Sequence, residues 1–389
     1  MQFVDLAAQQ KRIRADVEAR IKKVLDHGKY IMGPEVAELE SLLADFTGAR
    51  HCISCASGTD ALLMPLMAWA IGPGDAVFVP PFSFFATAEV VALLGATPVM
   101  VDIEPDTFNI SVQNLEKAIA AVTGQDASIY PLPKAALEKK LTPRVIIPVD
   151  LFGQPAEYAP LLALAARHGL LVLEDAAQSF GAEQKGGKAC ALGCQASATS
   201  FFPAKPLGCY GDGGAIFTDD DTLAQELRSI RVHGKGSDKY DNVRIGINGR
   251  LDTMQAAVLL AKMAVFPDEL RARQSVAAAY ADGLKNVAGV RAPVIRDGNL
   301  SAWAQYSILV ADSKRDALAG GLKERGIPTN IYYPTPMHML AVFTKLGYGP
   351  EDMPVSLASS REILALPFHP YLAVDDVRRI SAAIEQIVS

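Results

Sequence analysis

Lys205 lies in a segment whose residue types are unusual for a solvated lysine. The segment SFFPAKPLG (residues 200–208) places it after an aromatic stretch and between two prolines, and a glycine-rich run, residues 209–214, follows. Partial burial there lowers the pKa of an amine and increases the neutral form that attacks a carbonyl carbon. The segment therefore indicates imine chemistry, with a surface lysine in a loop as the alternative. The glycine run does not match G-x-G-x-x-G, so it is poor evidence for a nicotinamide fold.

A carboxylate follows an earlier apolar stretch, in the sequence LEDAAQ at residues 173–178. Asp175 is placed where it can accept a hydrogen bond from a protonated pyridine nitrogen, and its charge keeps such a ring an electron sink. A metal-binding or merely capping aspartate is the alternative. Gln178 reaches the phenolate side of the same ring if the turn continues as a helix.

Two further turns follow predicted strands. Ser57, Gly58 and Thr59 open a helix, and the backbone N–H groups at a helix N-terminus, helped by a hydroxyl, can hold a phosphate. A simple N-cap is the alternative. In PPFSFF (residues 80–85), Phe84 is the candidate for stacking on a flat ring, and core packing is the alternative. Phosphate turn, carboxylate and amine together favour pyridoxal 5′-phosphate (PLP) chemistry.

These residues follow strands in a pattern that alternates apolar runs with helical periodicity, which is typical of a mainly parallel α/β sheet covered by helices. In such sheets ligands bind at the carboxyl ends of the strands. The expected strands are 51–54, 76–79, 97–101, 145–149, 170–173, 198–202 and 215–218, and the helices between and after them are 60–69, 87–94, 112–121, 158–168 and 221–232.

The chain is expected to form two domains. Residues 1–250 give the large domain, with an N-terminal helical segment and a surface insertion at 123–143 that carries one short helix. Residues 251–389 give linking helices, broken at Pro267, and a smaller α+β domain with a strand at 304–310 and helices near 315–325 and 377–387.

Composition excludes several classes of function. The 389 residues are half hydrophobic and carry a formal charge of −6, which argues against a nucleic-acid binder. The longest apolar stretch, 61–72, is far short of the roughly 20 residues that cross a bilayer. No signal peptide is visible, so a cytoplasmic location is expected.

Five cysteines suggest reduced thiols, and no metal site is expected because the Cys52 and Cys55 side chains fall on opposite faces of a strand.

The sequence resembles the DegT/DnrJ/EryC1/StrS sugar aminotransferases, which are fold-type I PLP enzymes. The matching text runs in order over nearly the whole chain: GPEVAELE, SGTDAL, PPFSFFATAEVVALLGATPVMVDI, EDAAQSFGA, SFFPAKPLGCYGDGGAI, RIGINGRLDTMQAA and YYPTPMH. The resemblance implies a seven-stranded sheet and a homodimer with composite active sites. It further implies Schiff-base formation by Lys205, pairing of the ring nitrogen with Asp175, Gln178 beside the ring oxygen, phosphate contacts from Gly58, Thr59 and Ser200, and Asn248 reaching the phosphate from a second subunit.

The closest likeness is to transaminases of UDP-2-acetamido-3-oxo-hexuronic acid in bacterial surface-polysaccharide pathways, such as lipopolysaccharide O-antigen synthesis. The resemblance implies L-glutamate as donor, pyridoxamine 5′-phosphate as the intermediate cofactor form, and Lys205 as the proton carrier of both half-reactions. Two departures are the 123–143 insertion and Tyr332-Tyr333, where that branch tends to have His-Tyr. A C4 aminotransferase of a UDP- or dTDP-4-keto-6-deoxy sugar is the alternative.

Several residues are candidates for holding the substrate. Arg244 and Arg250 suit the carboxylate of the donor or sugar, or the diphosphate, because a planar guanidinium pairs well with such anions. Solvated or interface arginines are the alternative. The Tyr332-Tyr333 turn is expected to face the sugar, and His338 and His233 are equally compatible with substrate contacts and with structural roles.

Three rival functions remain to be weighed. Relatives that are sugar dehydratases carry histidine in place of the Schiff-base lysine, whereas Lys205 is present here. Regulators with a PLP fold carry an added DNA-binding domain, for which the sequence shows no spare N-terminal segment. A nicotinamide dehydrogenase is the third, and the absorption spectrum of the purified protein distinguishes it.

Overall fold

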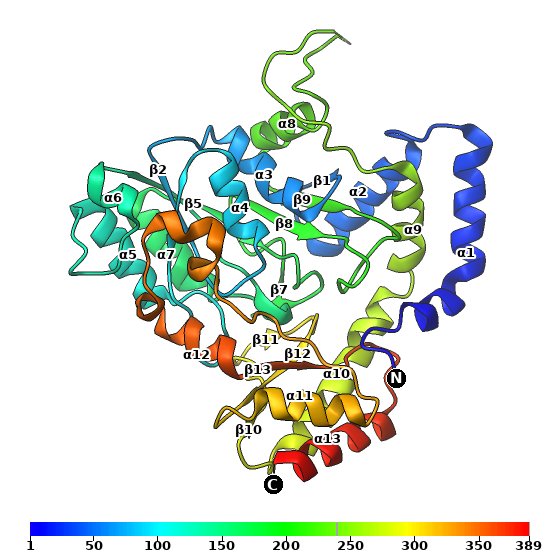
Figure 1. The fold of residues 1–389 in the computed structure, drawn as a ribbon. Helices are drawn as coiled ribbons and strands as arrows, with labels where there is room; N and C mark the ends of the chain where they lie inside the picture. The colour runs from blue at the N-terminus through cyan, green and yellow to red at the C-terminus, as the bar shows by residue number, and fades with distance from the viewer. Residues whose placement is uncertain (239, 389) are drawn as a thin grey trace.

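A seven-stranded sheet forms the centre of the molecule in the computed structural model, which describes residues 1–238 and 240–388 (Figure 1). The strand order is β1-β9-β8-β5-β4-β2-β3. Only β9 runs antiparallel to its neighbours, and the other adjacent pairs are parallel. The predicted mainly parallel sheet is therefore confirmed. Its strands are β1 (His51–Cys55), β2 (Asp75–Val79), β3 (Thr97–Met100), β4 (Thr142–Ile146), β5 (Leu171–Asp175), β8 (Ala196–Ser200) and β9 (Gly214–Thr218).

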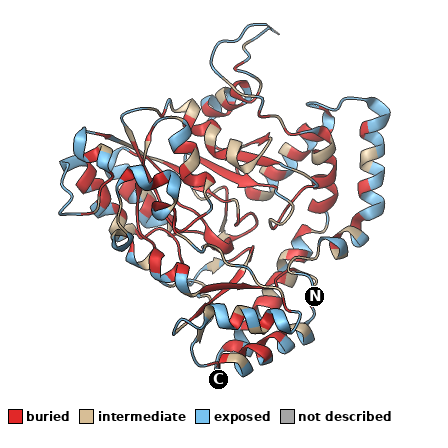
Figure 2. Ribbon diagram, in the orientation of Figure 1, coloured by how far each residue is buried: buried red, intermediate tan, exposed pale blue. Residues whose placement is uncertain are grey.

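Helices cover both faces of this sheet, and the buried side chains gather between the layers (Figure 2). One face packs against α3 (Gly58–Ala68), α4 (Ala86–Leu93), α5 (Val112–Gly124), α7 (Tyr158–His168) and α8 (Asp221–Ile230). The face toward α2 (Pro34–Thr47) and α9 (Thr253–Met263) buries a second set of side chains. Cys52 belongs to the second cluster and Cys55 to the first, which confirms that the strand turns them to opposite faces.

The region between α5 and β4 contains one short helix, α6 (Lys134–Glu138), as expected for the insertion. It is anchored to the body by Tyr130, whose hydroxyl accepts a hydrogen bond from the Asp102 N–H at 2.8 Å. The fourth strand begins at Thr142, three residues before the predicted start. Thr142 and Pro143 pair with the start of β2, and a bulge after Ala76 shifts the register.

A smaller body follows, built on an antiparallel sheet of order β10-β12-β13. Its strands are β10 (Val290–Arg291), β12 (Tyr306–Val310) and β13 (Ile363–Leu366), and its helices are α10 (Phe266–Leu284), α11 (Arg315–Glu324), α12 (Pro354–Glu362) and α13 (Val374–Val388). Pro267 lies in the first turn of α10, where its missing N–H breaks no helical hydrogen bond. The hydrophobic core of the smaller body begins at Val276 on α10. The buried side chains of α9 belong to the core of the large body instead. The division at residue 250 stays a prediction.

The remaining elements are short, apart from α1 (Leu6–His27), which packs along α9 at the edge of the molecule (Figure 1). A small sheet joins β6 (Glu183–Gln184), β7 (Gly187–Lys188) and β11 (Asn299–Leu300), and four 3₁₀ turns cover 151–153, 337–339, 341–346 and 350–352. Within residues 1–238 and 240–388, no helix has the length and apolarity to cross a bilayer, and no three histidine, cysteine or acidic side chains gather as a metal site.

A buried ion pair joins α2, β1 and the segment after α8. Arg231, 3% exposed, donates to the carboxylate of Glu40 and to the carbonyl oxygen of Ser54 at 2.8 Å. The same carboxylate accepts from the N–H and the hydroxyl of Ser54. The pair therefore ties the outer strand of the sheet to the segment that leads to Asn248.

We expect Glu40→Ala to lower the free energy of unfolding by about 3–5 kcal/mol, because it leaves the Arg231 charge buried without its partner. Urea denaturation of the variant measures this. Glu38→Ala is the matched control, since Glu38 lies on the same helix in an exposed ion pair with Arg20 and its loss should cost less than about 1 kcal/mol. Equal effects of the two variants would show that the buried pair has no special role.

Candidate active site

Lys205 and Asp175 come together at one edge of the central sheet. Asp175 ends β5 and Lys205 follows β8, the adjacent parallel strand, so both lie beyond carboxyl ends that meet at the same edge. Burial lowers the pKa of Lys205, and the charge of Asp175 partly opposes that effect. The structure thus gives Lys205 the depressed basicity that its sequence context indicated.

Asp175 is held by two hydrogen bonds. The Thr87 hydroxyl donates to Oδ2 at 2.8 Å, and the Ala177 N–H donates to Oδ1 at 3.2 Å. Burial raises the pKa of this carboxyl, whereas both hydrogen bonds and the charge of Lys205 lower it. Sequence reasoning missed Thr87. Its position in the first turn of α4, after the turn that follows β2, was the available signal.

The start of α3 forms a close contact with the end of β8. Ser57 Oγ accepts from the Asp60 N–H at 3.0 Å, so Ser57 is indeed the N-cap. A Cβ added at Gly58 would lie 2.6 Å from the Cβ of Ser200, which shows how closely the two backbones approach. The first N–H groups of a helix have no intrahelical acceptor. With the Ser200 side chain beside Gly58, these N–H groups form a cradle that would fit a phosphate group, and the phosphate contacts of Gly58, Thr59 and Ser200 stay predictions.

Gln178 and Tyr333 meet on the other side of Asp175. Residues 177–181 form turns and do not continue as a helix, and Gln178 is nevertheless buried with its Oε1 accepting from the Phe152 N–H at 2.8 Å. Burial raises the pKa of the Tyr333 hydroxyl, and a hydrogen bond with Gln178 lowers it. The charge of Asp175 also acts on Tyr333, so this tyrosine belongs to the same site. The Tyr332 ring lies 5.9 Å from that of Tyr333 and 6.3 Å from that of Phe3.

Three phenylalanines of residues 80–85 take different positions. Phe82 is fully buried, and Phe85 packs its ring 5.4 Å from that of Phe343. Phe84 is 57% exposed, which excludes the alternative of core packing for this ring. Its stacking role stays a prediction.

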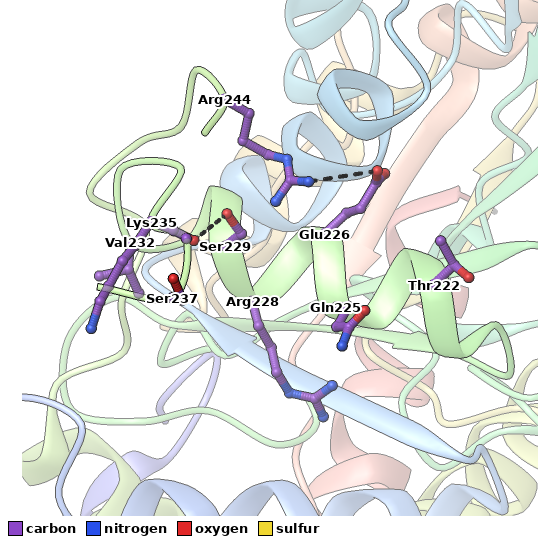
Figure 3. Close-up of a pocket in the computed structure, with 10 residues that line it drawn as sticks. Thr222, Gln225, Glu226, Arg228, Ser229, Val232, Lys235, Ser237 and Arg244 are labelled. Carbon is purple, nitrogen blue, oxygen red and sulfur yellow. Dashed lines mark hydrogen bonds and ion pairs between the residues drawn. The ribbon is translucent and has the colours of Figure 1, made fainter. Parts of the chain in front are cut away.

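The residues predicted to hold the substrate, Arg244 and His338, do not lie with Lys205 and Asp175 within one chain. Arg244 pairs with Glu226, Nη2 to Oε1 at 3.9 Å, on the wall of a pocket of about 580 Å³ between α8 and the loop after it (Figure 3). None of the cradle residues lines that pocket. His338 is 1% exposed, with Nε2 at 3.4 Å from the carbonyl oxygen of Pro350, which favours its structural role.

Asn248, Arg250 and His233 lie on the segment between α8 and α9, part of which projects from the body (Figure 1). Asn248 is exposed and pairs its backbone with Val232. Arg250 is half-buried, and its Nε is buried without a hydrogen-bond partner. His233 is exposed, with its N–H bonded to the carbonyl oxygen of Ile247. Their proposed contacts with cofactor or substrate stay predictions.

The sequence model of the DegT/DnrJ/EryC1/StrS aminotransferase family matches residues 11–385. The chain belongs to this family. A relative from Pseudomonas aeruginosa, named UDP-2-acetamido-2-deoxy-3-oxo-D-glucuronate aminotransferase, is 46% identical over 384 residues, which is 99% of each chain. Another, from Acidithiobacillus ferrooxidans and named UDP-N-acetyl-3-dehydro-alpha-D-glucosamine 3-aminotransferase, is 37% identical over 99% of this chain and 97% of its own.

Solved structures of family members superpose over the same length. A DegT DnrJ EryC1 StrS aminotransferase from Brucella abortus has a TM-score of 0.92 and 51% identity, with 99% of each chain covered. NtdA from Bacillus subtilis, with bound cofactor pyridoxamine phosphate, has a TM-score of 0.86 and 26% identity, over 99% of this chain and 83% of that one. The protein is therefore an aminotransferase that uses PLP, as predicted, and the nicotinamide dehydrogenase alternative is wrong.

We expect Gly58→Ala to weaken PLP binding by about tenfold or more, because its Cβ forces apart the start of α3 and the Ser200 side chain, and overpacking costs about 1–3 kcal/mol. Titration of the apo-protein with PLP, followed by visible absorbance, measures the affinity. In the control Gly72→Ala, the nearest atom to the new Cβ is 3.8 Å away, and binding should be unchanged. A normal affinity in Gly58→Ala would place the phosphate elsewhere.

Proposed function

We propose that this enzyme transfers the amino group of L-glutamate to C3 of a UDP-linked 3-keto-2-acetamido sugar or its uronic acid. The observation that carries the proposal is the half-buried Lys205 beside the carboxylate of Asp175, at the carboxyl ends of β8 and β5 and near the close approach of Gly58 to Ser200. Two relatives are named for UDP-linked 3-oxo sugars, which supports this substrate class. The product serves bacterial surface-polysaccharide synthesis, including lipopolysaccharide O-antigen, and a cytoplasmic location follows from its nucleotide-linked substrate.

Each residue of the site has a defined task in this proposal. PLP supplies an electron sink when bound. Lys205 would hold the cofactor covalently, and its free amine would carry a proton between the substrate carbon and the cofactor carbon. Asp175 holds the proton on the ring nitrogen. Gln178 donates to the ring oxygen, while Gly58 and Ser200 hold the phosphate. The same groups act in both half-reactions, because the second half is the first in reverse.

A homodimer with composite sites completes the proposal. Asn248 is exposed on its own chain, and the segment that bears it also exposes Val243 and Ile245, which are 55% and 85% accessible. Apolar side chains on a projecting segment favour burial against a second subunit. We infer that Asn248 reaches the phosphate of the partner's site, and that Arg250 then meets an anionic substrate group with its unpaired Nε.

Lys205→Ala should abolish both half-reactions and the borohydride-reducible adduct between protein and PLP, because no other group carries the amine at this position. Circular dichroism should show an intact fold, since the Lys205 side chain makes no hydrogen bond to any other residue within 1–238 and 240–388. Lys117→Ala, at an exposed position on α5, serves as the control and should retain full turnover. Turnover in Lys205→Ala would refute the assignment.

The substrate class is tested by incubating the enzyme with glutamate and a panel of UDP- and dTDP-linked keto sugars made in situ. We expect 2-oxoglutarate release with UDP-3-keto-2-acetamido sugars and at least about tenfold lower kcat/KM with 4-keto-6-deoxy sugars, because a missing partner for a buried polar group costs about 1–3 kcal/mol. Mass spectrometry identifies the aminated product. A preference for the 4-keto sugars would replace the proposal by C4 transamination.

A further inference from the structure

Two completely buried carboxyl groups lie directly behind Asp175. Asp150 follows β4, and Glu174 precedes Asp175 in β5; each is 0% exposed. The two carboxyls act on each other: the charge of Glu174 raises the pKa of Asp150, and a side-chain interaction with Asp150 lowers that of Glu174, so the two groups lie side by side. Two carboxylates in contact cannot both stay charged in a low-dielectric interior without strong compensation.

The groups that donate to this pair are all neutral. Asp150 accepts from the Ala156 N–H at 2.8 Å, the Tyr158 hydroxyl at 2.8 Å and the Ser179 hydroxyl at 2.7 Å. Glu174 accepts from the Cys190 N–H at 3.0 Å and the Ser197 hydroxyl at 2.6 Å. Among residues 1–238 and 240–388, no ion pair to either carboxyl is found, so hydrogen bonds alone stabilise the charge.

The segment that carries Asp150 is connected to the active-site turn in three places. The Asp150 N–H donates to the Asp175 carbonyl oxygen at 3.1 Å, and the Asp175 N–H donates to the Pro148 carbonyl oxygen at 2.9 Å. Ser179, which donates to Asp150 Oδ2, directly follows Gln178. Both ends of the turn that carries Asp175 and Gln178 are therefore fixed to the buried pair or its strand.

We propose that Asp150 and Glu174 share one proton and act as positioning residues for the turn at 175–179. The acid and the carboxylate hold Asp175 and Gln178 in their places and leave a single negative charge on the buried pair. The positioning role rests on the proposed function of Asp175, whereas the shared proton is a property of the protein alone.

The surroundings agree with one retained proton. Burial raises the pKa of both carboxyls. The titratable groups that face the pair are Tyr158 on α7, Asp175 on β5, and the thiols of Cys190 and Cys194. Burial also raises the pKa of Tyr158 and of both thiols, so these groups are neutral near pH 7 and bring no positive charge.

Infrared spectroscopy of the apo-protein in D₂O near neutral pH tests the shared proton without the cofactor. The wild-type protein should show the C=O band of a protonated carboxylic acid, and Asp150→Asn and Glu174→Gln should each lose it. Glu157→Gln is the matched control, because Glu157 is a half-buried glutamate nearby and its amide should leave the band intact. A wild-type spectrum without the band, or a band that survives in both variants, overturns the shared proton.

Unfolding as a function of pH gives a second measure. A carboxyl with a raised pKa in the folded state keeps a proton that the unfolded chain releases above about pH 4, so this proton destabilises the fold as pH rises. From pH 5 to 7, the folding constant of the wild type should fall relative to that of Glu174→Gln by up to about tenfold per pH unit. Parallel pH profiles of the two proteins would contradict the proposal.

Positioning is tested by comparing Asp150→Ala with Asp150→Asn in the PLP-bound enzyme. The alanine removes the acceptor of Ser179, and we expect kcat to fall about tenfold or more, with KM for glutamate changed much less. Asparagine keeps an acceptor and a donor and should restore most of kcat. Equal losses in both variants refute the positioning role. A wild type without transaminase activity but with the infrared band would refute the proposed function and leave the shared proton standing.

Discussion

The chemistry depends on one constraint, the meeting of an amine and a carboxylate at the carboxyl ends of two adjacent parallel strands. Lys205 follows β8 and Asp175 ends β5, so the register between these strands sets how the two groups face each other. Because the strands are buried on both sides, shifting that register would move whole rows of core side chains. The packing of the sheet therefore enforces the geometry of the site, and the site needs no ion pair of its own at the surface.

The same edge explains why small residues gather there. Gly58 and Gly214 both stand where a Cβ would overlap neighbouring atoms, at 2.6 Å from the Cβ of Ser200 and 2.4 Å from the carbonyl oxygen of Ser57. A phosphate can reach the first N–H groups of α3 only if nothing larger than a hydrogen intervenes. The N-cap by Ser57 satisfies one N–H group at this turn and does not exclude a phosphate on the others, so the two alternatives drawn from the sequence are compatible.

The sequence predicts the helices and strands that carry long apolar runs. It does not predict elements whose local pattern fits both a helix and a strand, or contacts between residues far apart in the chain. The strand Ile363–Leu366 follows α12 without an intervening turn residue, so its apolar residues look like one more helical turn. Thr87 looks like an ordinary residue in the first turn of a helix, and only the three-dimensional fold shows its hydroxyl 2.8 Å from Asp175. Arg244 was grouped with the substrate because of its charge, whereas within its own chain it pairs with Glu226.

Glu174 and Asp175 show how neighbouring acidic residues acquire different partners, although burial raises the pKa of both. Successive side chains of a strand point to opposite faces. Asp175 therefore meets the cation of Lys205 and the hydroxyl of Thr87, both of which stabilise its charged form. Glu174 meets Asp150, a second acid, and only neutral donors besides. One extended strand thereby places one carboxyl beside Lys205 and the other beside a second buried acid, and the two positions can be exchanged only if the side chains of the strand swap faces.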